Sequence, residues 1–71
     1  MPTVLKEKHT KLSRREKQII DKVLEGSTNK IIASELFISE RTVKFHCSNI
    51  YRKKEVPNRA TLILKMHKKL Y

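Results

Sequence analysis

The sequence predicts an all-α domain of four helices. Polar residues that favour helix N-caps precede stretches with apolar residues at helical spacing, and no stretch alternates apolar and polar residues as a half-buried strand does. Both prolines, Pro2 and Pro57, fall outside the helical stretches. These observations predict helices over about 14–25, 29–36, 40–54 and 59–69, joined by short turns.

The first helix is predicted to begin after Ser13. Ser13 and Glu16 have the spacing of a capping box, in which each side chain bonds to the backbone amide of the other residue. We therefore expect Glu16 to act as a cap and as an ion-pair partner for a basic residue. The apolar face of this helix is Ile19, Ile20, Val23 and Leu24. Gly26 follows, where a left-handed residue would end the helix.

The second and third helices also have recognisable caps. Thr28, or alternatively Ser27, can cap the second helix, and Ser39 can cap the third, with Glu40 in the first turn where the helix dipole favours negative charge. The buried face of the second helix is expected to be Ile32, Ala33 and Leu36, and that of the third Val43, Cys47, Ile50 and the adjacent Tyr51. Cys47 is thus expected to be a small core residue rather than a redox sensor.

The fourth helix differs from the others in its apolar pattern. Pro57 ends the third helix by about Glu55, and Asn58 can cap the next helix. Its apolar residues lie on more than one face, at Ala60, Leu62, Ile63, Leu64, Met66 and Leu70. A second apolar face favours self-association, and the alternative is that this face closes the core of the single chain.

The composition indicates a polyanionic partner. The 71 residues include 17 Lys and Arg against 7 acidic residues, which gives a net charge of +10 at pH 7. Such an excess fits nucleic acid, an anionic membrane surface or an acidic protein, because charge sets attraction without naming the ligand. A basic amphipathic chain that acts on membranes is disfavoured by the helix caps and polar turns.

Metal, catalytic and membrane-spanning functions have no support in the sequence. One cysteine excludes an internal disulfide, and His9, His46 and His67 lack zinc-ligand spacing. No nucleophile–base pair, carboxylate pair or phosphate-binding glycine loop occurs, so we expect neither enzyme activity nor a cofactor. No apolar run is long enough for a signal peptide or membrane span, and we expect a cytoplasmic protein. Residues 1–11 are expected to form a flexible basic arm before a domain at 12–71.

The order of residues from Leu12 onward resembles a known family. The motif is Leu12-Ser13-x-Arg15-Glu16, then Asn29-Lys30-x-Ile32-Ala33-x-x-Leu36-x-Ile38-Ser39-x-x-Thr42-Val43-Lys44-x-His46, followed by Arg52-Lys53-Lys54, Val56-Pro57 and Asn58-Arg59-Ala60. Over residues 12 to about 70 it resembles the LuxR-type (FixJ- or GerE-type) helix-turn-helix domains of bacterial transcription regulators. Ile31, Phe45 and Cys47 depart from that pattern, and Phe45 leaves the base preference open.

Three residues are predicted to contact DNA bases. Lys44, Phe45 and Ser48 share one face near the start of the third helix, and the resemblance implies the same positions. Lys can donate to guanine, Phe can pack on a thymine methyl group, and Ser can donate or accept. The alternatives are a solvated helix face for Lys44 and Ser48, and burial against the fourth helix for Phe45.

A wider set is predicted to contact phosphates and so to fix the register on DNA. Its members are Asn29, Lys30, Arg41, Thr42, His46, Asn49, Arg52 and Lys53. For the basic members the alternative is an ordinary solvated charge. For His46, which the resemblance assigns to phosphate, the alternative is packing at the edge of the core.

The resemblance implies a homodimer formed through the last helix. The candidate interface residues are Leu62, Leu64, Met66, His67 and Leu70. We therefore expect a sequence-specific transcription regulator that binds an inverted repeat in double-stranded DNA and consists of this domain alone, because too few residues precede Leu12 for another domain. RNA polymerase or another regulator would be a further partner. The alternative function is a small interaction partner that pairs with a larger transcription regulator and modulates it.

Overall fold

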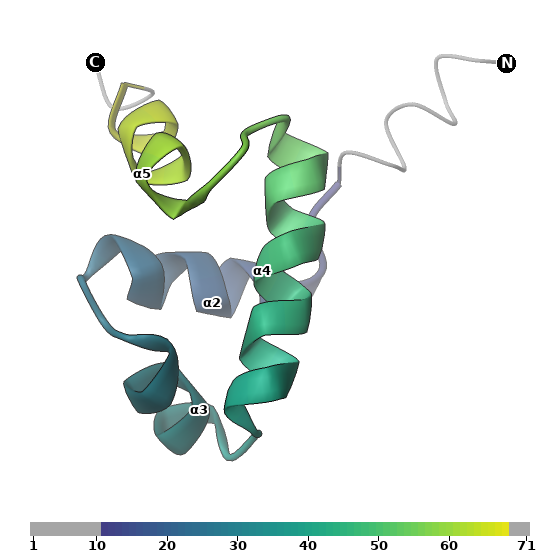
Figure 1. Cartoon of the computed structure of the whole chain (residues 1–71), viewed down its shortest axis with the longest axis vertical. Coiled ribbons are helices and arrows are strands. Elements are labelled where there is room, and N and C mark those ends of the chain that lie inside the picture. Colours follow the sequence, from purple (N-terminus) through teal and green to yellow (C-terminus); the bar gives the residue numbers. More distant parts are fainter. Residues whose placement is uncertain (1–10, 69–71) are drawn as a thin grey trace, which may run out of the picture.

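The computed structural model describes residues 11–68, and within that range it contains four α-helices and no strand. The helices are α2 (Arg14–Leu24), α3 (Asn29–Leu36), α4 (Glu40–Lys54) and α5 (Arg59–Lys68), as Figure 1 shows. The predicted all-α class is confirmed, and each predicted helix is found within a residue of its expected bounds. The predicted arm, except for Lys11, and Leu70 lie outside the described residues.

Each helix begins directly after the polar N-cap residue that the sequence suggested. Ser13 and Glu16 form the reciprocal capping box, with Ser13 N donating to Glu16 Oε1 over 2.8 Å and Glu16 N donating to Ser13 Oγ over 3.1 Å. The other three cap acceptors, each bonded to an amide three residues later, are Thr28, Ser39 and Asn58. Such a cap contributes about 1 kcal/mol to helix stability, so the helix starts are fixed by local chemistry.

The residues that terminate the helices were only partly predicted from the sequence. Gly26 follows α2 with a φ of 92°, as predicted for a left-handed terminating residue. The residues that terminate α3 and α4 also take left-handed backbone angles, but they are Phe37 at φ 60° and Glu55 at φ 58°. A side chain makes this conformation costly, by roughly 1–2 kcal/mol, and neither residue gives a sequence signal for it.

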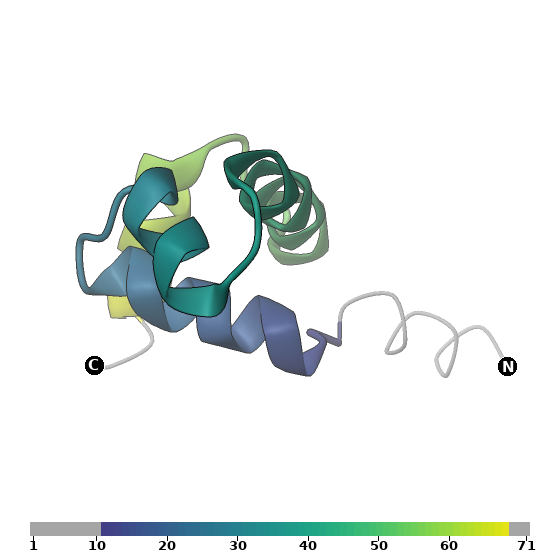
Figure 2. The ribbon, with the colours of Figure 1, turned by 90° about the horizontal axis from the view of Figure 1, so that it is seen from below.

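The core is formed where α4 packs against the other three helices. It contains the predicted apolar faces of the first three helices, together with Val56 and Leu62. Ile19, Ile32, Val43 and Ile50 have no exposed surface. In both views of the ribbon, one side of α4 is turned away from the other helices (Figure 1 and Figure 2). One side of α4, the longest of these helices, therefore packs on the core, and the opposite side is exposed.

One ion pair fastens α4 to α2. Lys53 Nζ lies 2.8 Å from Oε1 of Glu16, whose residue is 4% exposed. Burial raises the pKa of the Glu16 carboxyl, but the hydrogen bonds from Lys53 and from the Ser13 amide outweigh burial, so this pKa lies below its ordinary value. Both predicted roles of Glu16, as a cap and as an ion-pair partner, are confirmed.

Candidate nucleic-acid interface

The side of α4 that faces away from the core carries basic and polar side chains. On the buried side, Val43, Cys47 and Ile50 are at most 4% exposed. We call the opposite side the outer face of α4, and it consists of the exposed residues Arg41, Lys44, Phe45, Ser48 and Arg52. The predicted amphipathic helix is thus present, with its apolar stripe fully used by the core.

The three predicted base-contacting residues lie together on this outer face. Lys44 and Ser48 are exposed, and Phe45 is 62% exposed. The alternative that Phe45 is buried against the last helix is therefore wrong. The ring of Phe45 meets the ring of the half-buried His46 edge to face, with centroids 5.7 Å apart and planes at 64°. An aromatic ring held toward solvent on a basic face is suited to contact an apolar group on a base.

The predicted phosphate-contacting residues fall into two environments. Arg41 and Arg52 lie on the outer face, whereas Lys30 is exposed on α3. The half-buried members are Asn29, Thr42, His46 and Asn49. Two of these are held by neighbours on the same helix or cap, because Arg52 Nη2 donates to Asn49 Oδ1 over 3.0 Å and the hydroxyls of Ser39 and Thr42 are 2.9 Å apart.

Lys53 is a correction to the predicted phosphate set. Its ammonium is directed to Glu16 and its side chain is only 21% exposed. The reason is its place on the helix: Lys53 follows Ile50 by three residues and so lies at the border of the buried stripe, away from the outer face. Lys53 therefore holds the helix in place, and we remove it from the proposed DNA contacts.

Arg59 was not singled out as a site residue in the sequence. Its guanidinium Nη1 donates to Asn29 Oδ1 over 2.7 Å, and Nη2 donates to the Ser27 carbonyl oxygen over 2.6 Å. The available signal was a cation in the first turn of a helix, where the dipole disfavours positive charge, with no acidic residue in that turn. Such a cation is expected to find its acceptors on another element.

The predicted dimer face of α5 is smaller than expected. Leu62 is 1% exposed and belongs to the core, which corrects its assignment to an interface with a second chain. Met66 is half-buried against the core. Leu64 is 66% exposed and His67 is exposed. The alternative that α5 closes the core thus holds for Leu62. Leu64, by contrast, is an apolar side chain that is largely exposed to solvent.

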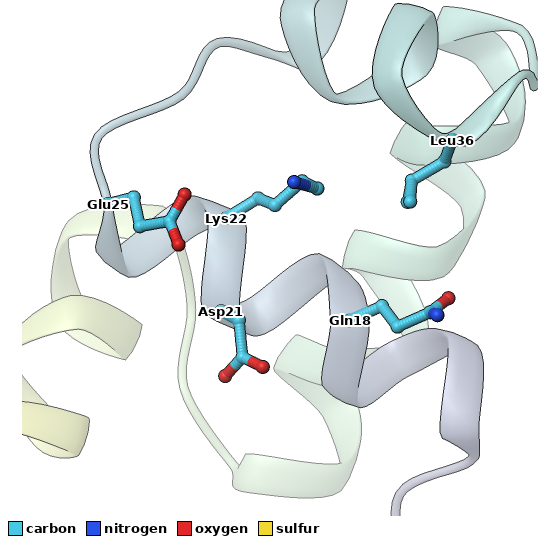
Figure 3. Close-up of a pocket in the computed structure, with 5 residues that line it drawn as sticks. All are labelled: Gln18, Asp21, Lys22, Glu25 and Leu36. Atoms are coloured by element: carbon cyan, nitrogen blue, oxygen red, sulfur yellow. The ribbon is translucent and has the colours of Figure 1, made fainter.

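The structure also has a shallow hollow of about 360 Å³ on another side of the molecule. It is lined by Gln18, Asp21, Lys22, Glu25 and Leu36, all from the α2 region and α3 (Figure 3). Lys22 is engaged there in an ion pair of 2.8 Å with Glu35. The lining mixes both charges with one leucine and includes no residue of the outer face, so we do not assign the hollow to DNA binding.

The structure also bears on the presence of a metal site, a reactive cysteine or a membrane-spanning helix. Within residues 11–68 no group of three or more His, Cys, Asp or Glu side chains lies close enough to hold a metal ion. Burial raises the pKa of the Cys47 thiol, which disfavours the reactive thiolate and agrees with its predicted place in the core. Among the helices of that same range, none is long and apolar enough to cross a membrane.

Comparison with known proteins matches the chain to one family model and shows that it is similar to several regulatory proteins. The family model described as bacterial regulatory proteins, luxR family, matches residues 10–66. The chain is 49% identical over 59 residues to the uncharacterized transcriptional regulatory protein YhcZ of Bacillus subtilis, across 83% of this chain and 28% of that protein. It is also similar to the monoamine regulon transcriptional regulator of Klebsiella aerogenes, at 48% identity over 73% of this chain and 23% of the relative. Against the response regulator protein TodT of Pseudomonas putida the identity is 49%, over 83% of this chain and 26% of the relative. The chain thus spans about a quarter of the length of these relatives.

Proposed function

The chain belongs to the luxR family of bacterial regulatory proteins, and from this premise we propose that it regulates transcription by binding double-stranded DNA at specific sequences, with α4 in the major groove. The observation that carries the proposal is the outer face of α4, which is basic and exposed and lies opposite a buried apolar stripe. A major groove about 12 Å wide admits one α-helix. Binding and positioning suffice for this role, and no catalysis is involved.

Base recognition is assigned to Lys44, Phe45 and Ser48. Their side chains are exposed near the N-terminal half of α4, the part of such a helix that meets base edges. Lys44 would donate to guanine O6 or N7, Ser48 would donate or accept, and Phe45 would pack on a thymine methyl group. The exposure of Phe45 supports this role, because an apolar ring gains free energy when the groove covers it.

Phosphate contacts are assigned to the residues that surround this helix. Arg41 and Arg52 would bind the backbone beside the groove, and Lys30 and Asn29 would bind it from the start of α3, assisted by Thr42, His46 and Asn49. These contacts carry no sequence information, but they fix the orientation of the helix in the groove. Most of the affinity for DNA of any sequence would come from them.

We further propose that two copies bind together through α5. Leu64 is 66% exposed although it is apolar, and His67 is exposed on the same helix. Under two-fold symmetry the two α4 helices would enter successive major grooves about 34 Å apart. The DNA site would then be an inverted repeat, because a two-fold pair presents the same surface twice.

Selection of bound DNA from a random duplex library tests the function directly. The proposal expects an enriched inverted repeat, protection of that repeat in a footprint by the purified chain, and affinity that falls steeply as salt is raised. Failure to enrich any sequence would contradict specific recognition. Protection of DNA only after a second regulator is added would favour the alternative function, in which the chain pairs with a larger protein and modulates it.

A further inference from the structure

Arg59 joins the start of α5 to the start of α3. Its two terminal nitrogens bond separately, one to Oδ1 of Asn29 at 2.7 Å and the other to the carbonyl oxygen of Ser27 at 2.6 Å. A cation is unfavourable in the first turn of a helix, and that turn of α5 holds no acidic residue. The two bonds to the neighbouring segment therefore explain why an arginine is tolerated there.

The bond from Nη1 of Arg59 fixes the direction of the Asn29 carboxamide. A guanidinium only donates hydrogen bonds, so the atom that it meets must be the oxygen of the amide. The amino group, Nδ2, is then turned to the other side. The Asn29 side chain has no further hydrogen bond within residues 11–68, and in that range no buried side-chain nitrogen or oxygen lacks a partner. It follows that Nδ2 reaches solvent with its donors free.

The surroundings of this amino group favour an anion. Asn29 is the first residue of α3, and Lys30 beside it is exposed. The Thr28 hydroxyl satisfies the amide of Ile31, so the amides of Asn29 and Lys30 still face the helix start without a partner inside the helix. Free amides at a helix N-terminus attract phosphate.

We propose that Arg59 is a positioning residue for DNA binding, which holds Asn29 so that its amino group donates to a DNA phosphate. The inference rests on the proposed function, because it assumes that the start of α3 lies against the DNA backbone. Arg59 itself touches no DNA in this arrangement. Its effect on affinity passes through Asn29.

The first test is Asn29→Asp, which keeps the shape of the side chain. One carboxylate oxygen still accepts from Arg59, but the donor that faces the phosphate becomes a negatively charged oxygen. We expect a fold as stable as that of the original chain and affinity for a short random-sequence duplex lowered by about tenfold or more. Unchanged affinity would show that Nδ2 does not face a phosphate and would overturn the proposal.

The second test is a double-mutant cycle with Arg59→Lys and Asn29→Ala, read out as affinity for the same duplex. Lysine keeps the charge, but one ammonium does not reproduce the two fixed bonds of the guanidinium. We expect Arg59→Lys to weaken binding about fivefold or more in the original chain, and to have little further effect once Asn29 is alanine. Equal effects of Arg59→Lys in both backgrounds would mean that Arg59 acts without Asn29.

A matched control separates positioning from stability. Lys65 also lies on α5 and also donates to a backbone carbonyl, that of Lys54, over 2.6 Å. Lys65→Met should leave the effect of Asn29→Ala on DNA affinity unchanged, and melting curves followed by circular dichroism identify the temperatures at which all variants are folded. If the original chain shows no salt-dependent binding to duplex DNA, the proposed function fails. If the chain binds but the effects of Arg59→Lys and Asn29→Ala on DNA affinity are additive, only the proposed role of Arg59 fails.

Discussion

The ammonium of Lys53 lies 2.8 Å from the carboxylate of Glu16, and this pair joins the last turn of α4 to the first turn of α2. Glu16 also caps its own helix through Ser13. The carboxylate therefore fixes two things at once, the start of α2 and the position of α4. The helix that carries the outer face is held from the end opposite to its proposed base-contacting residues.

Glu16→Gln should isolate the contribution of this ion pair. A glutamine at this position can still complete the capping box, so the substitution removes the charge and leaves the cap. A neutral amide oxygen in place of the charged acceptor of the Lys53 bond predicts a free energy of unfolding lower by about 1–3 kcal/mol. Urea denaturation followed by circular dichroism measures this difference. If the ion pair is responsible, Lys53→Met should add little in the Glu16→Gln background, and a variant as stable as the original would contradict the assignment.

The same carboxylate predicts an acid dependence of stability. The pKa of Glu16 in the folded chain lies below its ordinary value of 4.5. A lowered pKa means that the charged form favours folding, so this contribution is fully present above that ordinary value and is lost as the pH falls through the folded pKa. Urea midpoints measured from about pH 6 to about pH 3 should converge for the original chain and Glu16→Gln at the acid end. A constant difference across this range would disprove the linkage.

The fold was predictable because its signals are local. Ser13, Thr28, Ser39 and Asn58 cap amides three residues away, and apolar residues recur at the period of a helix. The outer face of α4 was predictable for the same reason: once Val43 and the rest of its stripe face the core, the basic residues must face outward. Local pattern thus suffices to place the proposed groove-facing residues.

The long-range pairs were beyond the reach of the same reasoning. Lys53 and Glu16 are 37 residues apart, and Arg59 and Asn29 are 30 apart. A basic residue at a helix surface has the same local pattern whether it meets solvent, phosphate or a carboxylate. The error at Leu62 has a similar origin, because apolar residues surround much of α5 and periodicity does not say which of them faces the core.

Lys44→Ala should distinguish base recognition from general attraction to DNA. Loss of a contact to a base edge costs about 1–3 kcal/mol on the selected site and much less on random duplex DNA. Affinities on both DNAs, measured at one salt concentration, give the comparison. Lys17→Ala, which removes an exposed cation from α2, is the matched control and should change both affinities equally. Equal losses for Lys44→Ala would exclude it from base contact.

Phe37→Gly should stabilise the chain. Phe37 has a left-handed φ of 60° and is 93% exposed, so its ring gains almost nothing from burial while its backbone is unfavourable for a residue with a side chain. Glycine relieves the backbone but adds entropy to the unfolded chain, and the net gain should be about 0.5–1 kcal/mol in urea denaturation. Phe37→Ala keeps a Cβ and should give no such gain. A loss of stability in Phe37→Gly would reveal a contact made by the ring.

Leu64→Glu should separate dimer formation from DNA binding by one copy. Leu64 is 66% exposed, so a glutamate there should leave the core intact, whereas two such residues facing each other across a two-fold axis would repel. We expect affinity for the selected inverted repeat to fall at least about tenfold and affinity for a half-site to change little. Sedimentation of the protein–DNA complexes should then show one copy in place of two.

Gln18→Glu places the same charge on an exposed position of α2 and should leave the complex with two copies. If Leu64→Glu still binds the repeat as a pair with undiminished affinity, the interface does not lie on this face of α5.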